Sequence, residues 1–195
     1  GCTMRSLLVL ARKEIRQIFL SPIAYAFLLV FVFFVTFQFF RTFFLIEIAA
    51  MDRFFYWIPF AYAVVIPGIT MRMWAEERKQ GTMEFLLTSP IETWQIVTAK
   101  FLAGLVLVSL CVFLTLFVPY TVGHFGPLDH GPVWGGYLGA ILMGGTCIAI
   151  GMFCSAFTQD QIVSFLAAVI VLLKPVLIGP DWVLTELDPG SLLGA

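Results

Sequence analysis

The sequence predicts an all-α, polytopic membrane helix bundle with one N-terminal interfacial helix and five transmembrane helices. Of its 195 residues, 61% are hydrophobic and 12% are charged, whereas soluble domains carry about 25% charged residues. The mean hydropathy is +0.99. A spanning helix needs about 20 mostly apolar residues, and long segments contain no Asp, Glu, Lys or Arg: residues 17–40, 54–71, 101–128, 131–159 and 161–173.

The first expected element is an amphipathic helix over residues 4–20. Arg5, Arg12 and Arg16 share one face of this helix, and apolar residues at helical spacing share another. Such a helix lies along a membrane surface with its cations toward water or anionic headgroups. Ser21 and Pro22 then suit the cap and first turn of a new helix.

Five spans follow within a single transmembrane domain of residues 1–195. They are predicted at about residues 22–40, 54–71, 100–122, 133–157 and from 161 to 173 or 178. Residues 174–195 contain no further run long enough to cross a bilayer.

The fourth span carries small residues three or four positions apart. Small residues let two membrane helices approach closely, so this face predicts a packing seam, either within the subunit or between subunits. Its residues are Gly136, Ala140, Gly144, Cys147, Gly151 and Ser155. The four cysteines lack CxxC spacing, and small apolar packing residues are their expected role.

The distribution of Lys and Arg predicts the orientation. The segment before the first span and the segment between spans two and three, counted through Lys100, together hold eight, against two in the first opposite loop. The positive-inside rule therefore places the N-terminus and the 74–94 loop in the cytoplasm.

The 74–94 loop stays in water, because inserting the five charges between Glu76 and Glu84 would cost more than about 12 kcal/mol. The span-two helix is expected to extend into this loop and to stop at Gly81. Ser89 to Glu92 forms S-P-x-E, a capping box with proline at the first helical position, which predicts the start of the helix leading into span three.

Residues 82–88 then form a short amphipathic helix between a glycine stop and a proline start. A helix this short is marginal in water, so it needs a surface for its apolar side chains. The lipid interface and a groove on a cytoplasmic protein are both open as that surface.

The segment EERKQGTMEFLLTSPI resembles the E-E-x-x-x-G-T-x-E-x-L-L-x-x-P-I/V pattern of ABC-2 type permeases, the membrane subunits of one class of ATP-driven transporter. LARKEIRQIFLSPIAY resembles the N-terminal interfacial helix of the same family. The resemblance covers about residues 4–173 and is closest to gliding-motility-type and copper-enzyme-maturation-type permeases.

The resemblance implies that residues 82–88 are a coupling helix that inserts into a cytosolic ABC ATPase. It assigns docking to Met83, Phe85, Leu86 and Leu87. The motif residues in this sequence are Glu76, Glu77, Gly81, Thr82, Glu84, Leu87 and Pro90. Gly81 and Pro90 would make the bends, and the glutamates would contact the ATPase or the interfacial helix, with a solvated face as their alternative role.

The family implies further partners and a location. Two permease subunits, identical or different, work with two ATPases that bind ATP and magnesium, so this chain would carry no cofactor or metal itself. An exporter in a bacterial inner membrane, with membrane lipid around it and no nucleic acid partner, is the expected setting. The family normally has a sixth span, which is absent here, and a fragment or frameshift is the expected explanation.

The sequence argues against other function classes. It contains no G-x-x-x-x-G-K-[ST] loop for nucleotide phosphates and no G-x-S-x-G or H-E-x-x-H motif, so an enzyme is not expected. His124, Asp129 and His130 could form an outer metal site, although loop residues are the simpler interpretation. A secondary transporter, which would place an ionisable residue deep in a span, and a non-transporting membrane scaffold are the alternatives.

Overall fold

The computed structural model describes residues 2–46, 52–79, 81, 92–125, 130–158 and 160–178. All regular structure within these ranges is helical, which confirms the all-α prediction. The helices are α1 (Cys2–Leu20), α2 (Pro22–Ile46), α3 (Asp52–Lys79), α5 (Thr93–Leu114), α6 (Phe117–Phe125), α7 (His130–Phe157) and α8 (Gln161–Ile178).

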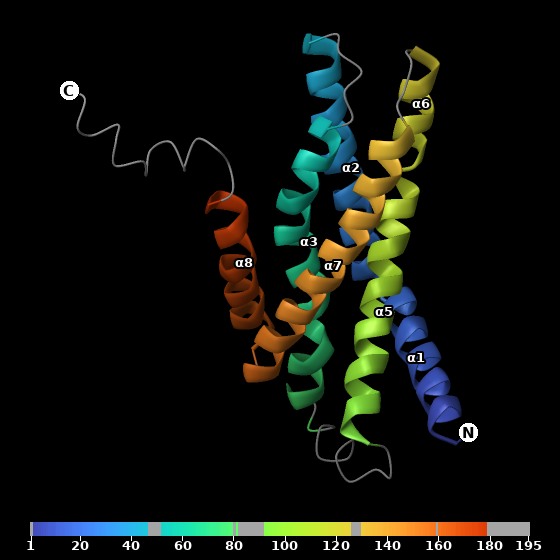
Figure 1. The fold of residues 1–195 in the computed structure, drawn as a ribbon. Helices are drawn as coiled ribbons and strands as arrows, with labels where there is room; N and C mark the ends of the chain where they lie inside the picture. Colours follow the sequence, from blue (N-terminus) through green and yellow to red (C-terminus); the bar gives the residue numbers. More distant parts are fainter. Residues whose placement is uncertain are drawn as a thin grey trace, which may run out of the picture.

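The helices form an elongated bundle around α3 (Figure 1). Helices α2, α7 and α8 all pack on α3, and α5 packs on α7. Helix α1 lies against α5 at the end of the bundle that also carries the last turn of α3 and the first turn of α5 (Figure 1). The beginning of α3 and the whole of α6 lie at the opposite end.

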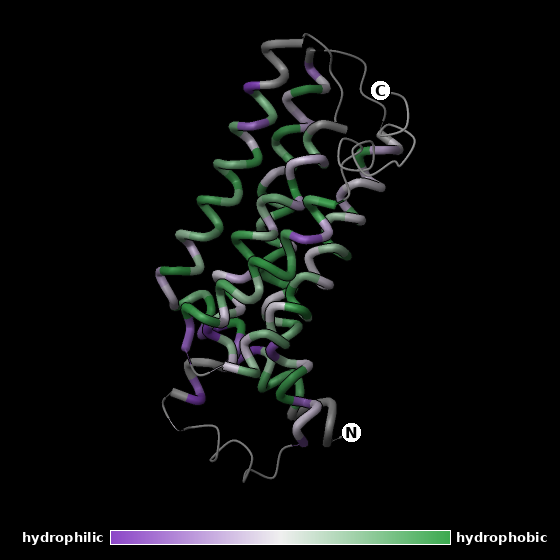
Figure 2. Tube along the Cα trace, turned by 90° about the vertical axis from the view of Figure 1, so that its left-hand side faces the viewer, coloured by the Kyte–Doolittle hydropathy of each residue, from purple (hydrophilic) through white to green (hydrophobic). Residues whose placement is uncertain are grey.

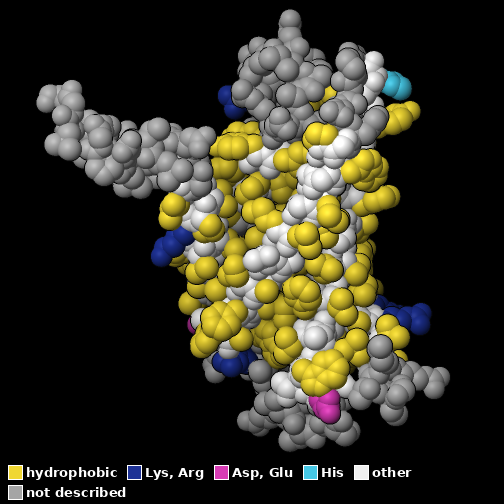
Figure 3. Space-filling view, viewed as in Figure 1, with side chains coloured by type: hydrophobic (Ala, Val, Ile, Leu, Met, Phe, Trp, Pro, Cys, Tyr) yellow, Lys and Arg dark blue, Asp and Glu magenta, His cyan; other side chains and the backbone are white. Residues whose placement is uncertain are grey.

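Five segments of the described chain are long and apolar enough to cross a membrane, as predicted. They are Pro22–Arg41, Phe54–Trp74, Thr93–His124, Gly131–Phe157 and Gln161–Ile178. Figure 2 shows hydrophobic residues along most of the bundle, with strongly hydrophilic residues mainly toward its ends. The face seen in Figure 3 is largely hydrophobic, and side chains such as Phe33 and Ile162 are more than 70% exposed. Such a surface is stable in lipid and not in water.

The third span differs from its prediction, because it is broken rather than one helix over residues 100–122. Helix α5 ends at Leu114, and α6 begins at Phe117. Pro119 has no amide hydrogen for the carbonyl of Thr115, four residues before it. Tyr137 of α7 donates to that carbonyl at 3.1 Å, and the Thr115 hydroxyl donates to the Val112 carbonyl at 2.6 Å. These bonds give the carbonyl and the hydroxyl of Thr115 hydrogen-bond partners where the helix is broken.

The predicted helix start at Ser89 and Pro90 is wrong. Helix α5 begins at Thr93, and Glu92 is its extended N-cap residue, with φ −68° and ψ 136°, rather than its third helical residue. The Glu92 carboxylate accepts a hydrogen bond from the Trp94 indole and makes no cap hydrogen bond. A capping box requires its glutamate at the third helical position, and Glu92 does not occupy that position in α5.

Candidate functional site

The end of α3 forms the boundary of the predicted coupling loop. Helix α3 includes the apolar span and continues to Lys79, so the motif residues Glu76 and Glu77 lie on the extension of a membrane helix. Gly81 has φ 69°, and its amide donates to the Arg78 carbonyl at 3.2 Å. Glycine adopts this left-handed backbone at little cost, and the predicted helix stop is confirmed.

Most residues assigned to ATPase docking lie outside the described residues. These are Thr82, Met83, Glu84, Phe85, Leu86, Leu87 and Pro90. Glu76 lies on α3, but the structure does not describe its side chain. The site is therefore built on Glu77, Gly81 and the helices that flank the loop.

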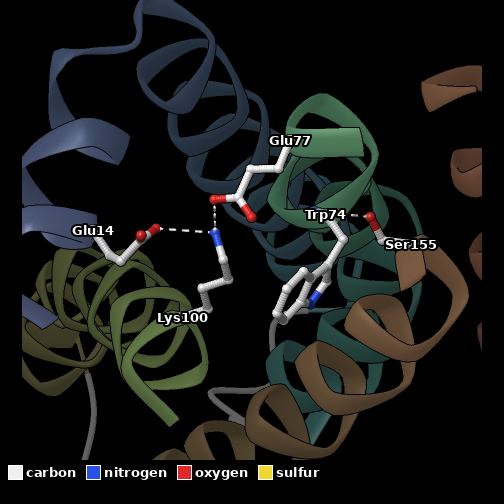
Figure 4. A network of polar contacts seen from close by, with 5 residues as sticks. All are labelled: Glu14, Trp74, Glu77, Lys100 and Ser155. Carbon is white, nitrogen blue, oxygen red and sulfur yellow. Dashed lines mark hydrogen bonds and ion pairs between the residues drawn. The ribbon is translucent and has the colours of Figure 1, made fainter. Parts of the chain in front are cut away.

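Three charged residues from three helices meet at the end of the bundle where α3 ends and α5 begins (Figure 4). Lys100 Nζ of α5 lies 2.8 Å from Glu77 Oε1 of α3 and 3.3 Å from Glu14 Oε2 of α1. The same ammonium lies 5.3 Å from the centroid of the Trp74 ring. We call Glu14, Glu77 and Lys100 the charge triad.

Burial makes the charge triad a specific link between the helices. The Lys100 side chain is 4% exposed, whereas the two carboxylate side chains are 12% and 24% exposed. A buried ammonium costs several kcal/mol in lost hydration unless carboxylates compensate for it. If α1 or α3 moved away while Lys100 stayed buried, the ammonium would lose a compensating carboxylate. The triad therefore favours an arrangement in which the three helices stay together.

The turn of α3 that carries Trp74, whose ring lies near Lys100, is also joined to α7. The backbone amide of Trp74 donates to Ser155 Oγ at 3.3 Å (Figure 4). The Ser155 hydroxyl in turn donates to the Met71 carbonyl at 3.3 Å. Ser155 is completely buried. The hydroxyl therefore joins the end of α7 to the turn of α3 that carries the Trp74 ring.

The rest of the small-residue face of α7 also lies on α3. The Tyr62 hydroxyl donates to the Ala140 carbonyl at 3.1 Å. A side chain added at Gly136 would overlap the Phe55 ring, and one added at Gly151 would overlap Thr70.

Gly144 occupies a junction where α7 meets two helices. A Cβ atom there would lie 2.5 Å from a methyl group of Val108 on α5 and 3.4 Å from the Tyr62 hydroxyl on α3. The absence of a side chain lets the three helices approach, as close membrane packing requires. In this structure, the small-residue face thus packs within the subunit.

Sequence reasoning did not identify the charge triad. Lys100 served only to count charge for the orientation, and Glu14 was given no role. The available signal was a single lysine directly before the long uncharged run 101–128. Lys100 is buried, yet it lies near the end of the bundle and is paired, so it differs from the deep ionisable residue expected of a secondary transporter.

The part of the chain that the structure describes contains no candidate metal site. No group of three His, Cys, Asp or Glu side chains gathers there, and Asp129 of the considered outer site lies outside that part. Cys111, Cys147 and Cys154 are free thiols within the membrane helices.

The apolar spans around a few buried polar contacts define a polytopic integral membrane protein. Comparison with protein families then gives its family: the description "ABC-2 family transporter protein" matches residues 47–187, and the chain belongs to this family. It is a membrane permease of an ABC transporter. The comparisons with curated proteins and with solved structures give no match.

Proposed function

We propose that this chain is the export permease of an ATP-driven transporter and that a separate cytosolic ATPase drives it through residues 82–88. Family membership supports the choice, because ABC-2 family permeases generally pair with an ATPase subunit. The observation that carries the proposal is the charge triad, which joins both helices flanking this segment. The ATPase would bind ATP and magnesium, and this chain would supply the moving membrane helices.

The geometry supports a mechanical role for the flanking helices. Helix α3 runs without interruption for 28 residues, about 42 Å at the rise of an α-helix. Its last turn holds Glu77, and the second turn of α5 holds Lys100. Because these residues are 2.8 Å apart, a force on the intervening segment would move both helices together and would pull α1 with them through Glu14.

Orientation and assembly complete the proposal. The N-terminus, the triad and Gly81 would face the cytoplasm of a bacterial inner membrane, as the distribution of Lys and Arg favours. A second permease subunit, identical or different, would complete the transport path. Because α3 already covers the small-residue face of α7, this second subunit would dock elsewhere.

Affinity purification from host membranes tests the ATPase coupling. The full chain should capture a protein that carries a phosphate-binding loop and hydrolyses ATP. The double variant Leu86→Asp and Leu87→Asp should lose it, because aspartates cannot fill an apolar groove. The matched control, Leu86→Met and Leu87→Met, preserves apolar bulk and should retain the ATPase. Full capture by the aspartate variant would refute docking through this segment.

The same preparation separates the alternatives. A permease should move its cargo only when the ATPase turns over, whereas a scaffold would retain the ATPase without ATP-dependent transport. A secondary transporter would work without the ATPase. No observation on the described residues favours either of these over the permease.

A further inference from the structure

A cavity of about 380 Å³ lies where α1, α2, α3 and α5 meet. Its volume is in the range of small-molecule sites. Apolar walls come from Ile18, Ile23, Phe27 and Ile69, and a charged wall comes from Arg72 and the charge triad. A ligand that fits it must therefore have a charged part and an apolar part.

The cavity crosses the boundary between the apolar spans and the charged end of the bundle. Ser21, the residue before α2, lines it together with Phe27, one and a half turns into that span. On α3 it reaches from Gly68 to Glu77, on both sides of Trp74, where the apolar segment ends. Lipid headgroups and the first carbons of their chains occupy this depth in a bilayer.

Arg72 supplies a positive group that the described part of the protein does not fully use. Arg72 lines the cavity, and its Nε atom is buried and has no hydrogen-bond partner among the described residues. A buried donor without an acceptor costs about 1–3 kcal/mol. A ligand with a phosphate would provide that acceptor, and guanidinium groups bind phosphate oxygens in a bidentate manner.

The charge triad supplies carboxylate acceptors to the same cavity. Glu14 and Glu77 each hold the ammonium of Lys100 through one oxygen, and an ionised carboxylate has about four acceptor sites. Both carboxylate side chains retain more exposure than the lysine, and both line the cavity. They can therefore accept hydrogen bonds from a ligand ammonium while they hold Lys100.

We propose that this cavity binds the headgroup of a phospholipid that has a primary amine. The phosphate lies on Arg72, the ammonium lies between Glu14 and Glu77, and the start of an acyl chain lies along Ile69 and Phe27. This site shares the charge triad with the proposed coupling mechanism, but it includes none of residues 82–88, and lipid binding there does not require the proposed ATPase.

The chemistry distinguishes this lipid from its common relatives. A primary ammonium donates three hydrogen bonds, which two carboxylates can accept, whereas a quaternary choline donates none. An anionic glycerol headgroup could place its phosphate on Arg72 but would bring hydroxyls, and no positive charge, to the two carboxylates. We therefore expect phosphatidylethanolamine to bind better than phosphatidylcholine or phosphatidylglycerol.

Native mass spectrometry of the full chain tests this expectation. The protein is equilibrated in detergent with equal amounts of the three phospholipids, all with the same acyl chains, and the retained lipid is counted. Phosphatidylethanolamine should exceed each of the others by about tenfold, the worth of a charge-assisted hydrogen bond. Equal retention of the three lipids by the unmodified protein would overturn the proposal, and so would displacement by inorganic phosphate.

Two variants locate the site. Arg72→Gln should reduce phosphatidylethanolamine retention by about tenfold, whereas Arg41→Gln, which removes an exposed arginine near the opposite end of α2, should not change it. Glu14→Gln should reduce the preference for ethanolamine over choline. Equal loss in the Arg72 and Arg41 variants would contradict the site. The lipid competition on the unmodified protein remains decisive if a variant does not fold.

Discussion

Lys100 on α5 and Glu77 on α3 form a 2.8 Å ion pair across the two helices that flank the coupling motif. Glu14 of α1 joins the same ammonium at 3.3 Å. One buried cation thus fixes three helices at the end of the bundle where an ATPase is proposed to act. Buried ion pairs often contribute little net stability but specify one arrangement of their elements.

Replacing Lys100 by methionine should destabilise the protein. The change removes the ammonium that the carboxylates of Glu14 and Glu77 share, and removing one partner of a buried pair costs about 3–5 kcal/mol. Thermal unfolding in detergent, followed by size-exclusion chromatography, measures the loss. Lys174→Met is the matched control, because Lys174 is exposed on α8, and it should unfold like the unmodified protein.

A neutral triad should recover much of that loss. Combining Lys100→Met with Glu14→Gln and Glu77→Gln removes the uncompensated charges together, and apolar or neutral replacements of buried ion clusters are often tolerated. If the triple variant were as unstable as Lys100→Met alone, the loss would come from packing around Lys100 rather than from charge.

A second prediction concerns the seam between α3 and α7. Gly151→Ala places a methyl group against Thr70, whose Cβ would lie 3.0 Å away. Thr70 is completely buried, and its hydroxyl donates to the Ile66 carbonyl at 3.0 Å, so it has little room to move. Overpacking of this kind costs about 1–3 kcal/mol, which a shift in the unfolding midpoint should show.

Gly139 on the same helix is the control for that substitution. A Cβ atom there has no neighbour within 4 Å, and alanine is the better helix former. Gly139→Ala should therefore unfold at the same temperature as the unmodified protein or slightly above it. Equal losses from both alanines would show that the contact with α3 does not limit stability.

The five spans, the small-residue face of α7 and the end of α3 could be predicted from the sequence. The long uncharged runs predicted the five spans because bilayer thickness sets their length. The spacing of Gly136, Ala140 and Gly144 predicted a face for close approach, and Gly81 predicted where α3 stops. These features depend on a few neighbouring residues and on the solvent around them.

Other features depend on residues far apart in the chain, which a local pattern does not contain. Lys100 is buried because Glu14 and Glu77, 86 and 23 positions away, lie on helices that happen to meet it. The start of α5 was mispredicted because the Glu92 carboxylate bonds to the Trp94 indole instead of capping the helix. The docking residues of the coupling segment remain a prediction.

The break in the third span gives a third prediction. Tyr137→Phe removes the hydroxyl that donates to the Thr115 carbonyl at 3.1 Å. That carbonyl keeps the amide of Val118 at 3.0 Å, so the loss should be about 1 kcal/mol, the net worth of one hydrogen bond. Tyr120→Phe, at a tyrosine that is 70% exposed on α6, should not affect thermal unfolding.

A double-mutant cycle with Pro119 assigns the cause of this loss. Alanine at position 119 restores an amide that can donate to the Thr115 carbonyl. The effect of Tyr137→Phe should therefore shrink in the Pro119→Ala background, and the two changes should not be additive. Strict additivity would mean that Tyr137 does not compensate for the proline.

The orientation of the chain is the last prediction. The charge of Lys100 is balanced by the carboxylates of Glu14 and Glu77. Without Lys100, the count is still seven Lys and Arg residues against two, so the positive-inside rule predicts the same orientation. Thr93 and Gly123 are exposed near the two ends of one span, Thr93–His124, and can be replaced by cysteine in a background without other cysteines.

A membrane-impermeant maleimide should then label the two positions from different sides. Gly123→Cys should react in intact cells, and Thr93→Cys should react only after the membrane is permeabilised. The reverse pattern would place the coupling motif outside the cell, where no cytosolic ATPase could reach it, and labelling of both positions in intact cells would contradict the third span itself. Because both cysteines flank the same two helices, each serves as the control for the other.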